Sequence, residues 1–141
     1  MLRSASLSAC VLLLCTVVAC SPAPAPAPLS DAAIAVRDAL PVERFRGRLG
    51  DAPVELLARD CKVFGVVRGA GQEVTLTEVL APAPSPFFTG CERQWLREED
   101  DAVIAVLGRR AFGAGGCCAT GGTWRTRDGQ TWEKISENAI P

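Results

Sequence analysis

The chain has 141 residues, with 15 basic and 16 acidic side chains and a formal net charge of −1 at neutral pH. It contains no histidine and no tyrosine, which excludes Ser–His and Cys–His catalysis and histidine-based metal sites. The near-zero charge gives no indication of a nucleic-acid partner or of binding to an anionic membrane face. We expect no metal, no cofactor and no nucleic acid.

The first 19 residues have the composition of a secretory signal peptide. Arg3 supplies the positive start, and an almost unbroken apolar run extends from Leu7 to Val18. This run is shorter than the roughly 20 apolar residues of a membrane-spanning helix, and Ser21-Pro22 after it stops a helix. We expect residues 1–19 to be removed on export.

The last residues of this leader carry a lipidation signal. The stretch Val17-Val18-Ala19-Cys20 resembles the lipobox of bacterial lipoproteins, although that family prefers leucine where Val17 stands. The resemblance implies that Cys20 is acylated and anchors the mature chain stably to a membrane, as more than one acyl chain does. Ser21 in place of aspartate implies the outer membrane, facing the periplasm, in a cell with two membranes. An ordinary leader cut near Ala19, leaving a soluble periplasmic protein, is the alternative.

Three further segments follow the leader. Residues 20–29 form a tether whose alternating prolines favour an extended rod of about 3.1 Å per residue; a proline-rich ligand is the alternative. Residues 30–41 form a short helical lead-in, capped by Ser30 and stopped by Pro41. Residues 42–138 form a single β-rich domain.

Within this domain the apolar residues recur with the period of two that indicates strands. In the first expected strand Phe45, Gly47 and Leu49 alternate with three arginines, Arg44, Arg46 and Arg48. A solvated strand face is the favoured interpretation of this arginine row, and a strip for an anionic ligand is the alternative. Further strands are expected over residues 54–58, 61–68, 74–79, 91–96 and 102–107.

Two other features of the domain have competing explanations. Phe87-Phe88 are expected to fill the core, because the chain has only five Phe and three Trp; an exposed aromatic tip is the alternative. Residues 98–101 form an acidic stretch, Glu-Glu-Asp-Asp, which we interpret as a solvated turn, since the spacing and central glycine of an EF-hand calcium loop are missing.

Four cysteines lie in the mature domain: Cys61, Cys91, Cys117 and Cys118. An even number of thiols in an exported domain indicates two disulfides, with three possible pairings. A zinc site would need paired ligands a few residues apart. We expect Cys61 and Cys91 to be joined to the adjacent Cys117-Cys118 pair; a ring within that pair, with Cys61 bonded to Cys91, is the alternative.

The strongest hairpin signal lies near the C-terminus, where Asp128-Gly129 separates two alternating runs and suits a two-residue type I′ turn. That register places Trp132 opposite Arg125, on an outer face shared with Arg127, which we name as a possible interaction surface. Residues 126–132 also resemble the Asp-box of sialidase-type propellers, matched at Thr126, Asp128, Gly129 and Trp132 but one residue short. That box is structural, so the resemblance implies only a turn backed by a tryptophan.

The sequence therefore predicts a mainly β protein: a small antiparallel barrel or sandwich of six to eight short strands, with one short N-terminal helix and disulfides. The favoured function is a non-catalytic envelope lipoprotein that presents a binding or accessory module to a protein partner. An inhibitor of a cell-wall hydrolase, like the lysozyme-inhibiting lipoproteins, is an alternative from architecture alone. A glycan hydrolase using Glu98, Glu99 or Asp100 is the least favoured.

Overall fold

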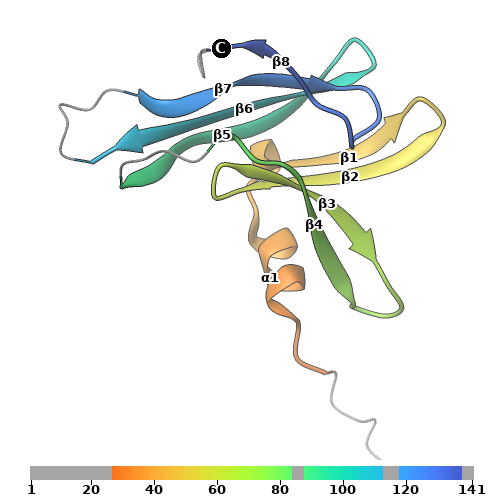
Figure 1. Cartoon of the computed structure of the whole chain (residues 1–141). Helices are drawn as coiled ribbons and strands as arrows, with labels where there is room; N and C mark the ends of the chain where they lie inside the picture. The colour runs from red at the N-terminus through yellow and green to blue at the C-terminus, as the bar shows by residue number, and fades with distance from the viewer. Residues whose placement is uncertain (1–26, 84–87, 113–117, 138–141) are drawn as a thin grey trace, which may run out of the picture.

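The computed structural model describes residues 27–83, 88–112 and 118–137, so the leader, Cys20 and Cys117 lie outside the described part. Eight strands account for most of it (Figure 1). In chain order the elements are helix α1 (Asp31–Asp38), the 3-10 helix η1 (Pro41–Glu43), and strands β1 (Arg44–Leu49), β2 (Ala52–Arg59), β3 (Lys62–Arg68), β4 (Val74–Leu80), β5 (Thr89–Glu99), β6 (Ala102–Ala111), β7 (Cys118–Thr126) and β8 (Glu133–Ser136). None of the described helices has the length and apolar character needed to cross a membrane.

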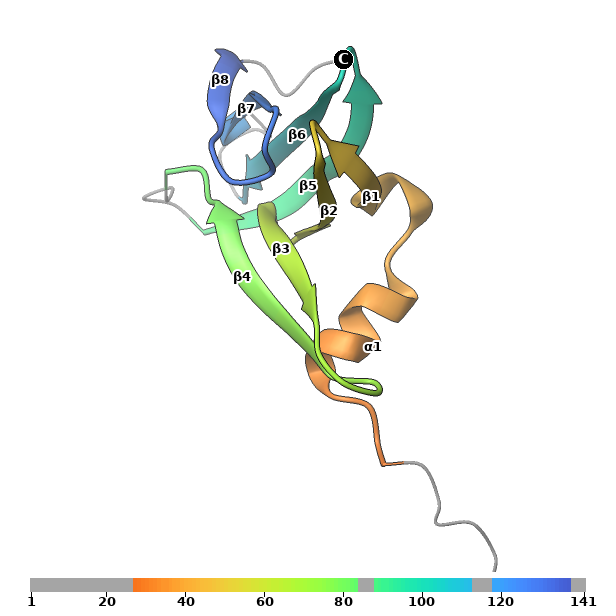
Figure 2. The same ribbon diagram turned by 90° about the vertical axis from the view of Figure 1, so that its right-hand side faces the viewer.

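The strands form two four-stranded antiparallel sheets, ordered β1-β2-β3-β4 and β5-β6-β7-β8 (Figures 1 and 2). Each sheet is a meander of neighbouring strands. One reversal in each sheet is a two-residue turn with both residues at positive φ, Asp60-Cys61 in the first sheet and Asp100-Asp101 in the second, as a type I′ turn requires. The second is the expected acidic turn, with all of its carboxylates exposed.

The two sheets pack against each other over one core. Its buried members come from both sheets: Phe45, Leu49, Leu56, Ala58 and Val63 from the first, and Leu96, Val103, Ala105, Leu107 and Trp124 from the second. The mainly antiparallel β prediction is confirmed, but a closed barrel is wrong. Strand pairing ends at each sheet's edge, so side-chain packing joins the layers instead of a continuous hydrogen-bonded wall.

Helix α1 lies on the outer face of the first sheet. Ser30 caps it as predicted, its hydroxyl accepting from the backbone N–H of Ala33 at 3.2 Å. The buried side chains of the helix pack against Leu57 and Val74. Leu57 faces the helix while its neighbours Leu56 and Ala58 face the core, because successive side chains of a strand point to opposite faces.

Candidate functional site

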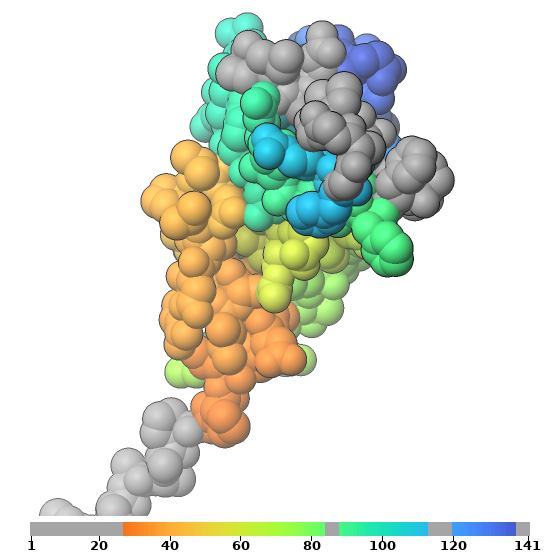
Figure 3. Space-filling view, turned by 90° about the vertical axis from the view of Figure 1, so that its left-hand side faces the viewer, coloured from red at the N-terminus to blue at the C-terminus, as the bar shows by residue number. Residues whose placement is uncertain are grey.

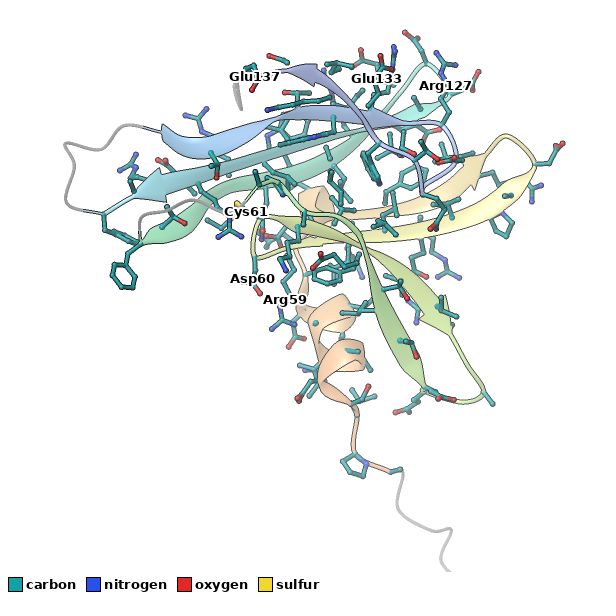
Figure 4. All side chains as sticks on the ribbon, viewed as in Figure 1. Arg59, Asp60, Cys61, Arg127, Glu133 and Glu137 are labelled. Atoms are coloured by element: carbon teal, nitrogen blue, oxygen red, sulfur yellow. A yellow bond between two sulfur atoms is a disulfide. The ribbon has the colours of Figure 1, made fainter. Side chains whose placement is uncertain are left out.

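The disulfide joins Cys61 to Cys91, so the predicted pairing of these residues with Cys117-Cys118 is wrong. The fully buried Cys61 lies in the β2–β3 turn of the first sheet, and Cys91 lies on β5 of the second, with their Cα atoms 5.4 Å apart (Figure 4). The bond therefore joins the two layers. Cys118 begins β7 opposite Arg110; its side chain and Cys117 lie outside the described part.

A hydrogen-bonded chain next to the disulfide joins both sheets to the lead-in. The side-chain oxygen of Gln94 accepts from the backbone N–H of Cys61 at 3.0 Å, and its amide donates to Glu43 at 2.7 Å. The second oxygen of Glu43 accepts from the backbone N–H of Leu40 at 3.0 Å. The two side chains that form these bonds, Gln94 and Glu43, are half-buried and hydrogen-bonded to other parts of the protein, so we assign them a structural role.

The predicted two-residue turn at Asp128-Gly129 is wrong. The observed register pairs Arg125 with Glu133, so residues 127–132 all belong to the connection between β7 and β8. The Asp128 carboxylate accepts from the backbone N–H groups of Gln130 at 2.8 Å and Thr131 at 2.7 Å. The buried hydroxyl of Thr126 accepts from the N–H of Gly129 at 2.9 Å. These side chains satisfy backbone donors that a tight hairpin would have paired across the strands.

This turn docks on the first sheet. A Cβ atom on Gly129, whose φ is +76°, would lie 2.7 Å from a methyl carbon of Val54 on β2, so only glycine permits this approach. Trp132 is half-buried and packs against the shared core. The Asp-box resemblance thus implied correctly a turn backed by a tryptophan, and the turn adds a second bridge between the layers.

The hydrogen bonds to Asp128 predict a specific acid sensitivity. The N–H groups of Thr131 and Gln130 lower the pKa of Asp128 to about 2 from its usual 3.8. A depressed pKa stabilises the fold above the unfolded value, and this contribution is lost as pH falls from about 4 to 2. Asp128→Asn should therefore be about 1 kcal/mol less stable than the parent at pH 7, and the difference should shrink below pH 4. Urea unfolding across that range measures it, and parallel pH profiles would contradict it.

The candidate surface of Trp132, Arg125 and Arg127 is not assembled as predicted. Trp132 packs against the core, whereas Arg125 is directed to Glu133, with 2.9 Å between its guanidinium and the carboxylate. Arg127 is exposed at the start of the β7–β8 turn (Figure 4). The change of register explains the difference, because Glu133 takes the position opposite Arg125 that Trp132 was expected to occupy.

The large exposed aromatic side chains lie elsewhere. Phe88 is 91% exposed and Phe112 is 68% exposed, so the expected core position of Phe88 is wrong; Phe87 lies outside the described part. The N–H of Phe112 donates to the carbonyl of Phe88 at 3.0 Å, which places the two residues side by side. Phe88 directly precedes β5 and Phe112 directly follows β6, so both lie at the same end of the second sheet, the end that faces the viewer in Figure 3.

The carboxylates of the hydrolase hypothesis lie at an exposed turn. Glu98, Glu99 and Asp100 are all exposed at the β5–β6 turn, and Glu99 is paired with Arg97 at 2.7 Å. A glycosidase needs two carboxylates facing each other across a cleft, an arrangement that this turn does not provide. Among the described residues no group of three or more Cys, Asp or Glu side chains is arranged to hold a metal ion.

A hollow of about 560 Å³ lies on the outer face of the first sheet, across β1, β2 and β3. Its polar lining is Arg46, Arg48, Arg68 and Glu55, and its apolar lining includes Val66 and Val67. The arginine row predicted for the first strand is exposed, as expected. What the sequence did not reveal is that the sheet brings Arg68, from β3, to the same hollow.

No family model matches the chain, and neither a curated protein nor a solved structure matches it. Its class is therefore defined by its own architecture: a two-layer antiparallel β domain with a helix on one outer face and a disulfide between the layers.

Proposed function

We propose that this chain is a bacterial envelope lipoprotein, anchored through Cys20, whose β domain is a non-catalytic module that binds a protein partner. The leader, the lipobox-like stretch and the Pro-Ala tether support the anchor. The disulfide between Cys61 and Cys91 fits the oxidising compartment that export implies.

The observation that carries the partner hypothesis is the pair of exposed phenylalanines at one end of the second sheet. Two neighbouring phenylalanines with side chains 91% and 68% exposed present apolar surface to water, and aromatic side chains are enriched at protein interfaces. Charged side chains border the two phenylalanines, as they do at the rim of a protein interface. Arg110, which lies opposite Gly90 on β5, is paired with Glu92.

Photo-crosslinking in cells tests the partner hypothesis directly. A benzoyl-phenylalanine placed at Phe112 should capture a discrete envelope protein. The same group at Arg127 should not, because Arg127 is exposed in the β7–β8 turn, at the opposite end of β6 from Phe112. Equal capture from both positions, or from neither, would contradict the assignment of this end. If the captured protein is a cell-wall hydrolase, purified chain should slow its turnover at stoichiometric amounts.

The anchor has an independent test. Mass spectrometry of the mature chain should find acyl groups on an N-terminal Cys20, and Cys20→Ser should abolish incorporation of labelled fatty acid. An unmodified mature N-terminus near Ser21 would overturn the lipoprotein proposal and leave the alternative of a soluble periplasmic protein.

A further inference from the structure

The hollow on the first sheet shares its face with α1. Arg44, first of the arginine row on β1, donates to the carbonyl of Val36 in the helix at 3.1 Å. Arg46 and Arg48 continue along the same strand face, so they extend beyond the helix contact. Val66 both lines the hollow and packs against the cluster that holds α1. The hollow is therefore the part of the helix-bearing face that the helix leaves uncovered.

The hollow carries an excess of positive charge. Its carboxylate, Glu55, has a side chain that is only 14% exposed and accepts two hydrogen bonds from Arg68, at 2.6 and 2.8 Å. These bonds hold the pKa of Glu55 below its usual value against the opposing effect of burial, and Arg46 adds to the shift. One arginine thus neutralises the glutamate, and two more guanidinium groups remain.

Those two guanidinium groups are available at the surface. The Arg46 side chain is 76% exposed and lies 4.0 Å from Glu55, too far for a strong pair. Arg48 donates one of its N–H groups to the carbonyl of Asp51, which leaves the rest of its fork toward solvent. Paired arginine forks match the oxygens of a phosphate group in geometry and in charge.

The course of the chain places this face close to the proposed membrane. The described chain begins at Ala27, just before α1 (Figure 1). Seven peptide units separate Ala27 from Cys20, and they can span at most about 25 Å. A lipid on Cys20 therefore keeps the helix end of the domain near the headgroups.

We propose that the hollow binds the phosphate group of an anionic phospholipid in the membrane that carries the chain. Arg46 and Arg48 bind the phosphate oxygens, and the ion pair of Arg68 with Glu55 lines the hollow beside them. The phosphate contact turns the helix-bearing face toward the bilayer. This inference rests on the proposed lipid anchor, and its test is designed so that the two can fail separately.

The experiment reconstitutes the lipidated mature chain in vesicles of neutral phosphatidylcholine, with or without anionic phosphatidylglycerol, and follows modification of each arginine by phenylglyoxal. Arg46 and Arg48 should react several-fold more slowly in the anionic vesicles, whereas Arg127, exposed in the β7–β8 turn, should react equally in both. Equal rates for Arg46 and Arg48 in the two vesicles would overturn the proposal.

Variants test the site further, because the protection of one arginine can be measured after the other has been replaced. With Arg46→Gln, the phosphatidylglycerol content that half-protects Arg48 should rise about fivefold, the effect of one basic residue near an anionic surface. Arg127→Gln removes the same charge elsewhere and should leave that content unchanged. An equal effect of the two substitutions would show that protection depends only on net charge and would overturn the site. Unchanged unfolding midpoints show that both variants are folded.

Two further measurements distinguish a bilayer from a soluble source of phosphate, and the phosphate site from the lipid anchor. Soluble glycerol phosphate at matched phosphate concentration should give no comparable protection; if it protects equally, the bilayer source is wrong. If the chain fails to float with neutral vesicles but phosphatidylglycerol still protects Arg46 and Arg48, the anchor fails and the phosphate site stands. Flotation with both vesicle types without protection leaves the anchor and overturns the site.

Discussion

Replacing both Cys61 and Cys91 by serine should lower the free energy of unfolding by about 3–4 kcal/mol. The bond closes a loop with a sequence separation of 30 residues, and a crosslink of that span removes roughly this much chain entropy from the unfolded state. The loss should exceed that of a surface bond because Cys61 is fully buried between the layers. Urea unfolding of the parent and the double variant measures the difference.

One control variant accompanies this experiment. Cys117→Ser/Cys118→Ser should leave the Cys61–Cys91 bond intact, so non-reducing tryptic maps of parent and control should both join the Asp60–Lys62 peptide to the peptide that contains Cys91. A link from Cys61 to Cys117 or Cys118 would contradict the observed pairing. It would restore the connectivity that the sequence alone favoured.

Leu56→Ala should cost about 2–5 kcal/mol, the usual effect of removing a large side chain from a tightly packed core. Leu56 is 1% exposed on β2 of the first sheet, in the cluster that also holds Leu107 and Trp124 of the second. Since the layers share this core, a cavity made in one sheet should destabilise both. The matched control, Leu40→Ala, removes a side chain that is 59% exposed and should change stability by less than about 0.5 kcal/mol.

The positions of the tryptophans make this test specific. Trp95 and Trp124 lie on strands of the second sheet, and Trp132 follows in its β7–β8 turn. Fluorescence therefore reports on the second sheet, whereas far-ultraviolet circular dichroism reports on both. Leu56→Ala should shift the two transitions together to lower urea concentration. A shift in circular dichroism with unchanged fluorescence would show that the sheets unfold independently and would contradict the shared core.

Local features were predictable because their causes are local. Ser30 caps α1 through a bond to Ala33, three residues away, and the alternation around Phe45 follows from the geometry of an isolated strand. The same holds for the acidic turn at Asp100, whose residues are exposed whatever lies beyond it. Each of these depends on chemistry within a few residues, and the sequence contains that chemistry in full.

The candidate sites were less predictable, because each depends on a neighbour far away in the chain. The arginine row was visible in β1, but its partnership with Glu55 and Arg68 needed the β1–β2–β3 register. Phe88 looked like a core residue by its chemistry, and only the packing of the two layers shows that it lies beyond their shared core.

The sequence by itself determined a mainly β, antiparallel chain with a capped helix before it, because period, turn and cap are properties of short segments. The tertiary structure decided the partner of Cys61, the direction of Trp132 and the separation into two sheets. Four cysteines allow three pairings, and sequence alone does not decide among them; a one-residue change of register moves a side chain to the other face. The free energy that selects among these comes from packing between segments far apart in the chain, which no local pattern contains.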